Sequence, residues 1–209
     1  MVAEQTLGVV VLAGGTSVRL GGGDKTALDV GGLPILVRLL SGLPVVPTVV
    51  VAPPPATALP GALAHVRWTR EDPPGGGPAA GLAAGFAALP GGLDVVVVLA
   101  GDQPFAATAV PRLVAALRAS DEAVDAVLGV DGAGRPQPLL AAYRATALGR
   151  ALPRVRNGDS IRSAIAGIAR AFLELAPTEH LDVDNSEDLA RAREVAGEWA
   201  ERPGRDQSG

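Results

Sequence analysis

Continuous apolar runs alternate along the chain with segments in which apolar residues recur at helical spacing. Short apolar runs of this kind are typical of strands that are buried on both faces of a sheet. They predict strands at residues 7–13, 45–51, 65–68 and 94–100. Helical spacing predicts helices at residues 33–40, 78–89 and 107–120, the first of them with Pro34 in its first turn. Because strands and helices alternate, we expect an α/β fold with a mostly parallel sheet and helices on both faces.

The alternation changes after residue 124. Apolar runs at 125–131 and 137–144 flank a glycine-containing turn, which predicts two strands joined as a hairpin. We expect this pair to form edge strands or a small β-rich lobe over the rim of the sheet. The remaining predictions are helices at 145–154, 160–169 and 186–199, a strand at 172–175 and a flexible tail at 201–209. Asn185 is a suitable N-cap for the last helix.

Composition excludes several classes of function. The chain has no cysteine, which rules out thiolate catalysis and zinc–thiolate sites, and two histidines are too few for a histidine-based metal cluster. A net charge of -4 and an aromatic content of 3% argue against nucleic-acid binding. With no apolar run of membrane length and no basic signal-peptide start, we expect a cytoplasmic protein with no membrane partner.

A glycine-rich segment, LAGGTSVRLGGGDK at residues 12–25, follows the first predicted strand and contains the only lysine of the chain, Lys25. Free backbone N–H groups between a strand and a helix bind anions, phosphates above all. The segment is neither a Walker A loop, because Asp24 precedes Lys25, nor a dinucleotide fingerprint. Arg19 and Lys25 together suit a triphosphate, whereas a mobile surface loop is the alternative for glycine alone.

Asp102 follows the strand at 94–100 directly after Gly101, a residue that permits a sharp exit from the sheet. Because ligands of parallel sheets bind at the carboxyl ends of the strands, Asp102 and the glycine-rich segment are expected on one rim. A carboxylate at such a position suits Mg²⁺ shared with phosphate oxygens. The alternative is that Asp102 caps the next helix.

Five motifs in this order resemble those of the MobA-like nucleotidyltransferases, and among these the molybdenum cofactor guanylyltransferases. The most specific is the segment at 12–25. The others are GPAAGL at 77–82, GDQPF at 101–105, PLLAAY at 138–143 and DVDNSEDL at 182–189. The resemblance spans about residues 7–195. It departs at Ala79, where the family has leucine, and at Asn185-Ser186, where the family has Thr-Pro.

The resemblance implies a single-domain, Rossmann-like nucleotidyltransferase fold over residues 1–200, with a nucleotide-binding half at about 7–120 and an acceptor-binding half at about 121–200. It implies transfer of GMP from GTP to the molybdopterin-bound molybdenum cofactor, with release of pyrophosphate. GTP and a molybdopterin-type cofactor are then the substrates and Mg²⁺ the metal. Cofactor-delivery proteins or molybdoenzymes are the implied transient partners.

The resemblance also implies roles for individual residues. Those that would hold the nucleotide through the backbone are Leu12, Ala13, Gly14 and Gly15. Those that would act on the phosphates and the metal, and so form the catalytic set, are Arg19, Lys25 and Asp102, with Asp102 as the Mg²⁺ ligand.

Acidic and basic residues elsewhere are candidates for the remaining contacts. Asp72 stands where the family has an acidic residue that contacts the guanine nucleotide, and Glu71 is its alternative. Asp182 and Asp184 would face the acceptor. Three arginines in the same half are further candidates for the acceptor phosphate, although a solvated or ion-paired side chain is the favoured alternative for each: Arg135, Arg144 and Arg162.

Other functions remain open at this point. Cytidylyl or other nucleotidyl transfer to molybdopterin or another small phosphorylated acceptor would use the same fold. The second glycine, Gly15, favours a purine, whereas Ala52-Pro53 offers the base no polar side chain. A non-catalytic carrier of the cofactor or the nucleotide is the alternative from another class.

Overall fold

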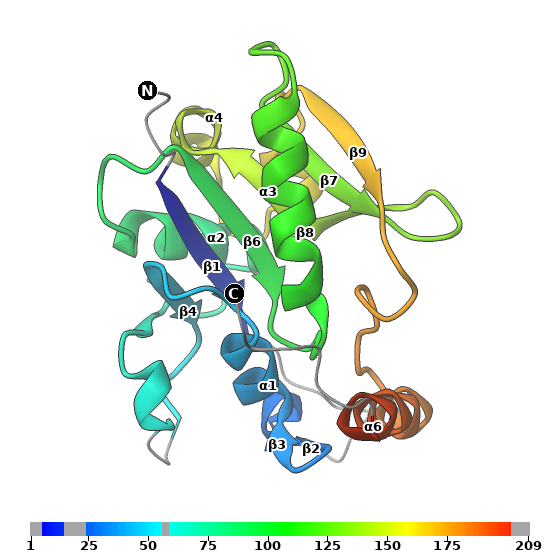
Figure 1. The fold of residues 1–209 in the computed structure, drawn as a ribbon. Helices are drawn as coiled ribbons and strands as arrows, with labels where there is room; N and C mark the ends of the chain where they lie inside the picture. Colours follow the sequence, from blue (N-terminus) through cyan, green and yellow to red (C-terminus); the bar gives the residue numbers. More distant parts are fainter. Residues whose placement is uncertain (1–5, 15–23, 56–58, 202–209) are drawn as a thin grey trace.

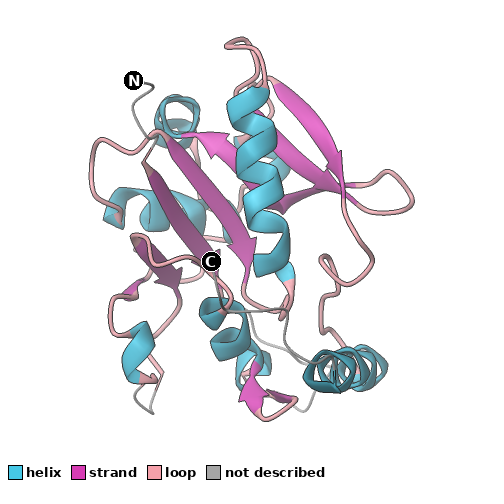
Figure 2. Ribbon diagram, in the orientation of Figure 1, coloured by secondary structure: helices cyan, strands magenta, loops and turns pink. Residues whose placement is uncertain are grey.

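A computed structural model describes residues 6–14, 24–55 and 59–201. One seven-stranded sheet runs through the molecule in the order β5-β4-β1-β6-β8-β7-β9 (Figure 1). Helices lie on both sides of it, and a further helix, α6, lies beyond the ends of the strands (Figure 2). The structure therefore has the α/β architecture that the alternating pattern predicts.

The half of the sheet that contains the amino-terminal strands is parallel. Its members are β1 (Leu7–Leu12), β4 (Thr48–Val51), β5 (Arg67–Thr69) and β6 (Val95–Ala100). β1 lies between β4 and β6, with Leu12 opposite Val51 on one side and Ala100 on the other. Because the ends of these three strands are in register, the loops that follow them meet at one edge of the sheet.

The other half of the sheet contains one reversed strand. β8 (Pro136–Arg144) is antiparallel to β6 and to β7 (Ala126–Val130), and β9 (Arg170–Glu174) is parallel to β7 and forms the margin of the sheet. The β-rich part expected after residue 124 is thus the far half of the same sheet rather than a separate layer. Two strands and a hairpin turn had been predicted here, and all are present.

Two apolar layers hold helices against the sheet. One packs α1 (Ile35–Ser41) and α3 (Val110–Ala119) through residues such as Leu39, Leu113 and Leu117. The other packs α2 (Pro78–Ala88), α4 (Ala145–Ala151) and α5 (Ile161–Ala164) through Leu82, Leu148 and Ile161. α2 approaches the sheet closely because Gly85 has no side chain: a Cβ there would lie 2.5 Å from Val10 Cγ1.

A third, smaller apolar cluster attaches α6 (Ser186–Glu201) to the carboxyl edge of the sheet. It includes Val183, Ala192 and Phe105, and the ring of Phe105 lies 4.9 Å from that of Trp199. A two-stranded ribbon of β2 (Asp29–Val30) and β3 (Leu33–Pro34) contributes Val30 to the same cluster. The carboxyl-terminal chain is therefore folded back onto the rim where the predicted site residues lie.

Several predicted boundaries are wrong in detail. Pro34 is not in the first turn of α1 but precedes it as the N-cap residue, and the helix predicted at 160–169 is only the single turn of α5. Glu201 belongs to α6, whereas residues 202–209 of the predicted tail lie outside the described residues. The ribbon of β2 and β3 and two 3₁₀ helices, η2 (Lys25–Ala27) and η3 (Gly61–Leu63), had no counterpart in the prediction, whereas the helix predicted at 107–120 begins as the 3₁₀ helix η4 (Ala106–Ala109) and continues as α3.

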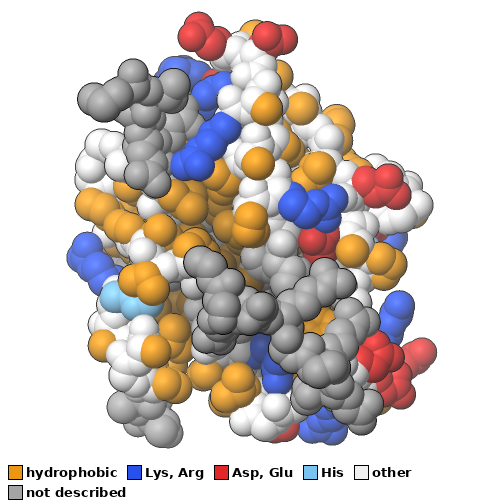
Figure 3. Space-filling view, viewed as in Figure 1, with side chains coloured by type: hydrophobic (Ala, Val, Ile, Leu, Met, Phe, Trp, Pro, Cys, Tyr) orange, Lys and Arg blue, Asp and Glu red, His pale blue; other side chains and the backbone are white. Residues whose placement is uncertain are grey.

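The surface has no dominant charge on the face shown in Figure 3. There the basic side chains of the described residues are scattered among apolar and neutral ones, with no continuous basic area. Within the described part of the chain, none of the helices is both long and apolar enough to cross a bilayer.

Candidate active site

A cleft of about 790 Å³ opens at the carboxyl edge of the parallel half of the sheet. The residues that follow β1, β4 and β6 form much of its wall, because these three strands end side by side. Its lining includes Leu12, Ala13, Gly14, Lys25, Ala52, Pro53, Pro54, Pro55, Arg70, Glu71, Gly77 and Asp102. Of the residues predicted to bind the nucleotide, Leu12, Ala13, Gly14, Lys25 and Asp102 are thus brought together.

Gly101 holds the ends of β1 and β6 close to each other. Its N–H donates a hydrogen bond of 2.8 Å to the carbonyl of Leu12, and a Cβ at this position would lie 2.7 Å from Ala13 Cβ. Real Cβ atoms do not approach one another so closely, so any side chain here would push the two loops apart. This close approach places Asp102 beside the start of the glycine-rich segment.

Lys25 lies between two carboxylates that come from distant parts of the chain. Its Nζ donates to Asp102 Oδ2 at 2.5 Å and to Asp184 Oδ1 at 2.8 Å. The side chains of Lys25 and Asp102 are 16% and 21% exposed, whereas that of Asp184 is 50% exposed. The three residues, which we call the Lys25 cluster, thus form a partly buried ionic group at the cleft with its acidic end open to solvent.

Local hydrogen bonds orient the lysine. Asp24 precedes η2 as its N-cap, and its Oδ1 accepts from the backbone N–H of Thr26 at 2.9 Å and from the Thr26 hydroxyl at 2.7 Å. This cap fixes the turn from which Lys25 points to Asp102. The Asp-Lys-Thr sequence that rules out a Walker A loop therefore has a structural role of its own.

Asp184 is positioned from the segment before α6. The N–H of Val183, a fully buried residue, donates to the carbonyl of Asp102 at 3.1 Å. Asn185 Oδ1 accepts from the backbone N–H of Glu187 and Asp188 at 2.9 and 3.0 Å, which confirms it as a cap of α6. The carboxyl-terminal segment is therefore attached directly to the loop that carries Asp102.

Asp102 does not cap the following helix. The N-cap position of η4 is Phe105, which makes no capping bond through its side chain, and the Asp102 carboxylate is bonded to Lys25 instead. The structure thus removes the helix-cap alternative for this residue. What it leaves is a carboxylate at a strand end that faces a cation.

Burial and neighbouring carboxylates shift the pKa values of two residues at the site. Burial acts to lower the pKa of Lys25, but hydrogen bonds to Asp102 and Asp184 outweigh it and raise the pKa above its usual value. Burial raises the pKa of Asp182, and the nearby negative charges of Asp184, Asp102 and Asp188 raise it further. Lys25 is thus firmly cationic, while the acidic side of the site carries an excess of negative charge.

The remaining residues that were predicted to belong to the site do not all line the cleft. Glu71, rather than Asp72, lines the cleft, and its Oε1 accepts from Gly75 N–H at 3.0 Å.

Arg135 is paired with Asp131, and Arg144 donates to the backbone carbonyls of Val124 and Asp121, so both have structural partners. Arg162 is exposed and does not line the cleft. Gly15 and Arg19 lie outside the described residues.

Sequence reasoning missed several contributors to the cleft, Arg70 and Leu139 among them. Arg70 follows β5 and Leu139 lies in β8, and both line the cleft. Arg70 belongs to none of the five motifs, and Leu139 lies in the motif at 138–143 without having been given a role, so the three-dimensional order of the strands is what places both at the cleft. The signal that the sequence offered for Arg70 is its position just after the strand predicted at 65–68.

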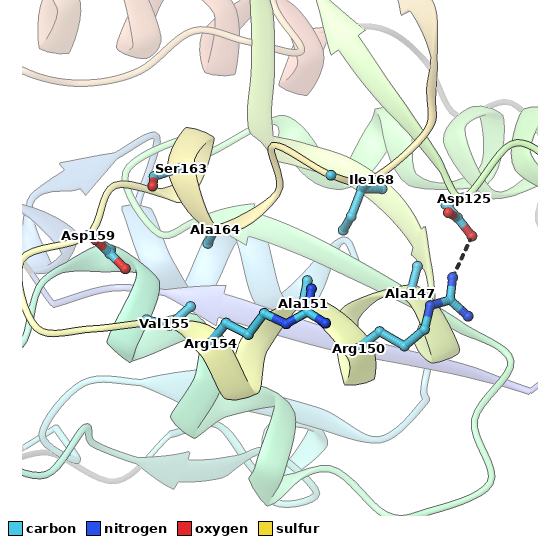
Figure 4. Close-up of a pocket in the computed structure, with 11 residues that line it drawn as sticks. Asp125, Ala147, Arg150, Ala151, Arg154, Val155, Asp159, Ser163, Ala164 and Ile168 are labelled. Carbon is cyan, nitrogen blue, oxygen red and sulfur yellow. Dashed lines mark hydrogen bonds and ion pairs between the residues drawn. The ribbon is translucent and has the colours of Figure 1, made fainter.

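A second hollow, of about 330 Å³, lies between α4 and α5 (Figure 4). Arg150 and Arg154 extend along one wall, Asp159 and Ser163 lie across from them, and Arg150 is paired with Asp125 at 3.2 Å. Asp125 precedes β7, which runs in the same direction as β6, so it lies at the edge of the sheet opposite Asp102. None of the predicted site residues lines this hollow.

Comparison with solved structures shows the same fold in several nucleotidyltransferases. A molybdopterin-guanine dinucleotide biosynthesis protein A from Archaeoglobus fulgidus matches with a TM-score of 0.66 and 22% identity, covering 91% of this chain and 99% of that one. A nucleotidyl transferase from Methanothermobacter matches with a TM-score of 0.68 and 21% identity, covering 93% and 99%. The 2-C-methyl-D-erythritol 4-phosphate cytidylyltransferase from Thermus thermophilus matches with a TM-score of 0.64 and 20% identity, covering 90% and 98%.

The fold alone does not distinguish among these nucleotidyltransferases, so the sequence decides the family. No curated protein matches the chain significantly. The sequence profile of the MobA-like NTP transferase domain does match, over residues 9–180, and this range includes most of β1, the glycine-rich segment, Asp102 and the strands of both halves of the sheet. The chain therefore belongs to the MobA-like NTP transferase family, and its activity is nucleotidyl transfer.

Proposed function

We propose that this protein transfers GMP from GTP to a molybdopterin-type cofactor and releases pyrophosphate. The observation that carries the proposal is the Lys25 cluster, in which one cation at the nucleotide cleft contacts both Asp102, at the end of β6, and Asp184, on the segment before α6. Lys25 thus lies where a nucleotide bound along β1 would meet an acceptor bound near α6.

The cleft supplies what a nucleoside triphosphate requires. The backbone at Leu12–Gly14 and the side chain of Lys25 provide N–H groups and a positive charge for the phosphates. The wall formed by residues 52–55 is apolar and suits the face of a base. Glu71 supplies two carboxylate oxygens in the same cleft, and guanine, unlike cytosine, presents two adjacent N–H donors that a carboxylate accepts together.

The donor set is compatible with Mg²⁺. Among the described residues, no group of three or more acidic, histidine or cysteine side chains is placed to hold a metal ion. Mg²⁺ is commonly bound by one or two carboxylates together with substrate phosphates, so Asp102 with a triphosphate forms an adequate set. When bound, the ion would offset the negative charge that gathers on the phosphates during transfer.

The chain's own residues account for the remaining requirements of the reaction. An acceptor phosphate is already ionised at neutral pH, so its attack on the α-phosphorus needs no general base. In agreement with this, neither His65 nor His180 lines the cleft. Transfer between two anions depends on positioning and on charge, and Lys25 offsets charge on the released pyrophosphate.

Cytidylyl transfer is the second candidate. It is favoured by the wall at residues 52–55, which offers no polar side chain to distinguish guanine, and by the fold shared with the cytidylyltransferase from Thermus thermophilus. A non-catalytic nucleotide carrier is the third, and it would have no use for the pairing of Lys25 with Asp102.

Isothermal titration with GTP and CTP in the presence of Mg²⁺ tests the choice of base. We expect tighter binding of GTP, and a Glu71→Gln variant should reduce that preference while binding CTP as the unmodified protein does. Pyrophosphate release with GTP and molybdopterin tests the chemistry. Preference for CTP would favour the cytidylyl alternative, and nucleotide binding without pyrophosphate release would favour the carrier.

A further inference from the structure

β9 is an edge strand of the sheet, and the order of its side chains bears on what can pair with it. β9 pairs with β7 on one side only, and no element lies beyond it in the sheet (Figure 1). Its sequence is RAFLE, and the burial alternates, with the first, third and fifth residues exposed. Phe172, in the middle, is a large apolar residue that is 55% exposed.

The backbone groups on the open side belong to the exposed residues. Ala169 O accepts from Ala126 N–H at 3.0 Å, and Leu175 N–H donates to Val130 O at 3.0 Å, so the odd-numbered residues face β7. Because successive residues of a strand direct their backbone groups to opposite sides, Arg170, Phe172 and Glu174 present theirs outward. The carbonyl of Glu174 accepts one bond from Arg112 Nη2 at 2.8 Å and retains a second lone pair.

Some of the known devices against edge pairing are missing from β9 itself, although it carries two charged side chains. Natural proteins protect open edges with proline, charged side chains, lysine above all, or a bulge. The five residues of β9 include no proline and no lysine, and the pairing with β7 is regular throughout. The Arg170 guanidinium makes only a long contact of 3.5 Å, with Ala166 O, and no ion pair is formed by the carboxylate of Glu174 within the described chain.

We propose that β9 is a dimer interface at which two copies of this chain pair antiparallel, centred on Phe172, so that the two sheets become one. In this register Arg170 of each copy lies opposite Glu174 of the other, and the two Phe172 side chains are neighbours. On the other face of the sheet Ala171 lies opposite Leu173, a small residue against a large one, and both residues already pack on the apolar layer of α3. The sequence RAFLE is thus self-complementary at all five positions.

Other registers satisfy fewer of these pairs. Shifting one strand by two residues, which keeps the outward backbone groups opposite each other, sets Arg170 against Phe172 and leaves one charged residue of each copy without an opposite partner. Cross-strand pairs of opposite charge and of aromatic residues are the stabilising ones, and like charges directly opposite are destabilising. A twofold axis through Phe172 is therefore the arrangement that the side chains select, and it is the symmetry that most homodimers have.

The test measures the mass of the full-length protein in solution by sedimentation over a concentration series. We expect the mass to rise from 21.0 kDa toward twice that value. Arg170→Glu and Glu174→Arg, which each set like charges opposite one another twice, should each weaken association at least tenfold. The double variant Arg170→Glu with Glu174→Arg restores opposite charges and should restore association.

Controls separate this interface from others and from unfolding. Val45→Glu changes another exposed apolar residue, 84% exposed and remote from β9, and should leave association unchanged. Circular dichroism and the melting temperature establish that each variant is folded. A mass of 21.0 kDa at every concentration, association that survives both single reversals, or a double reversal that fails to restore what the single ones remove would each overturn the proposal.

Discussion

Two ionic groups in this molecule contain similar residues, but one lies at a cleft and the other within a turn. The Lys25 cluster joins residues 77 and 159 positions apart in the chain at the mouth of a cleft. The pair of Asp131 with Arg135 closes a turn between β7 and β8, with Arg135 Nε 2.7 Å from Asp131 Oδ2. The first group lies in the parallel half of the sheet and the second in the half that contains the reversed strand.

The hydrogen bonds around each group show how far its charges are satisfied within the fold. Asp131 is almost fully buried and also accepts from the backbone N–H groups of Ala133 and Arg135 at 3.0 and 2.9 Å, so its charge is satisfied within the turn. Asp102 has the Lys25 ammonium as its side-chain partner, and Asp184 is half exposed beside it. A self-contained group stabilises the fold, whereas a group that keeps open lone pairs at a cleft can exchange partners with a ligand.

Removal of the Asp102 carboxylate should have the largest effect on activity. We expect Asp102→Ala to reduce nucleotidyl transfer by about 10³-fold or more, because the strand-end carboxylate is lost where phosphates and Mg²⁺ would meet. The melting temperature should change little, since Asp102 is not a helix cap. Pyrophosphate release measures the first effect, and near-normal turnover would refute the metal role of this residue.

The charge and shape of Lys25 are tested separately. Lys25→Ala should be nearly as damaging as the loss of Asp102. Lys25→Arg keeps the charge, but a planar guanidinium does not fit between two carboxylates that are 2.5 and 2.8 Å from a single nitrogen, so we expect a loss of about 10- to 100-fold. Steady-state kinetics with GTP measure it, and full activity would show that any cation suffices at this position.

The two carboxylates before α6 should differ from each other. Asp184 contacts Lys25, whereas Asp182 is half-buried among negative charges. We therefore expect Asp184→Asn to raise the KM of the acceptor several-fold with a smaller change for GTP, and Asp182→Asn to affect binding less. Equal effects of Asp184→Asn on both substrates would mean that this residue serves the nucleotide rather than the acceptor.

Local patterns predicted the parts of this molecule that local physics decides. The apolar runs predicted the strands of both halves of the sheet, and the rule that ligands bind at the carboxyl ends of parallel strands placed the glycine-rich segment and Asp102 on one rim. Nothing local indicates that Lys25 contacts Asp184, because that contact depends on how the third apolar cluster folds α6 back onto the rim. The same limit explains Arg135: its charge was visible, but the turn that pairs it with Asp131 was not.

The smallest expected effect concerns the turn between β7 and β8, and it lies in stability alone. Backbone hydrogen bonds from Arg135, followed by its side chain and the N–H of Ala133, outweigh burial and hold the pKa of Asp131 below its usual value of 3.8. A carboxyl whose pKa is lowered on folding stabilises the protein above its unfolded pKa, and this contribution is lost as the pH falls through the folded value. Asp131→Asn should therefore lower the melting temperature by a constant few degrees at neutral pH.

That difference should begin to narrow as the pH falls below the unfolded value of 3.8, and it should disappear once the pH has fallen through the lower folded pKa, where the folded carboxyl is protonated as well. Thermal unfolding of both proteins between pH 2 and 7 measures it, with the change in nucleotidyl transfer at pH 7 as the companion measurement. Activity should be unchanged at a temperature where both are folded, since Asp131 does not line the cleft. A loss of activity comparable to that of Lys25→Arg would remove the distinction between the two ionic groups, because the turn would then act on the site as well as on the fold.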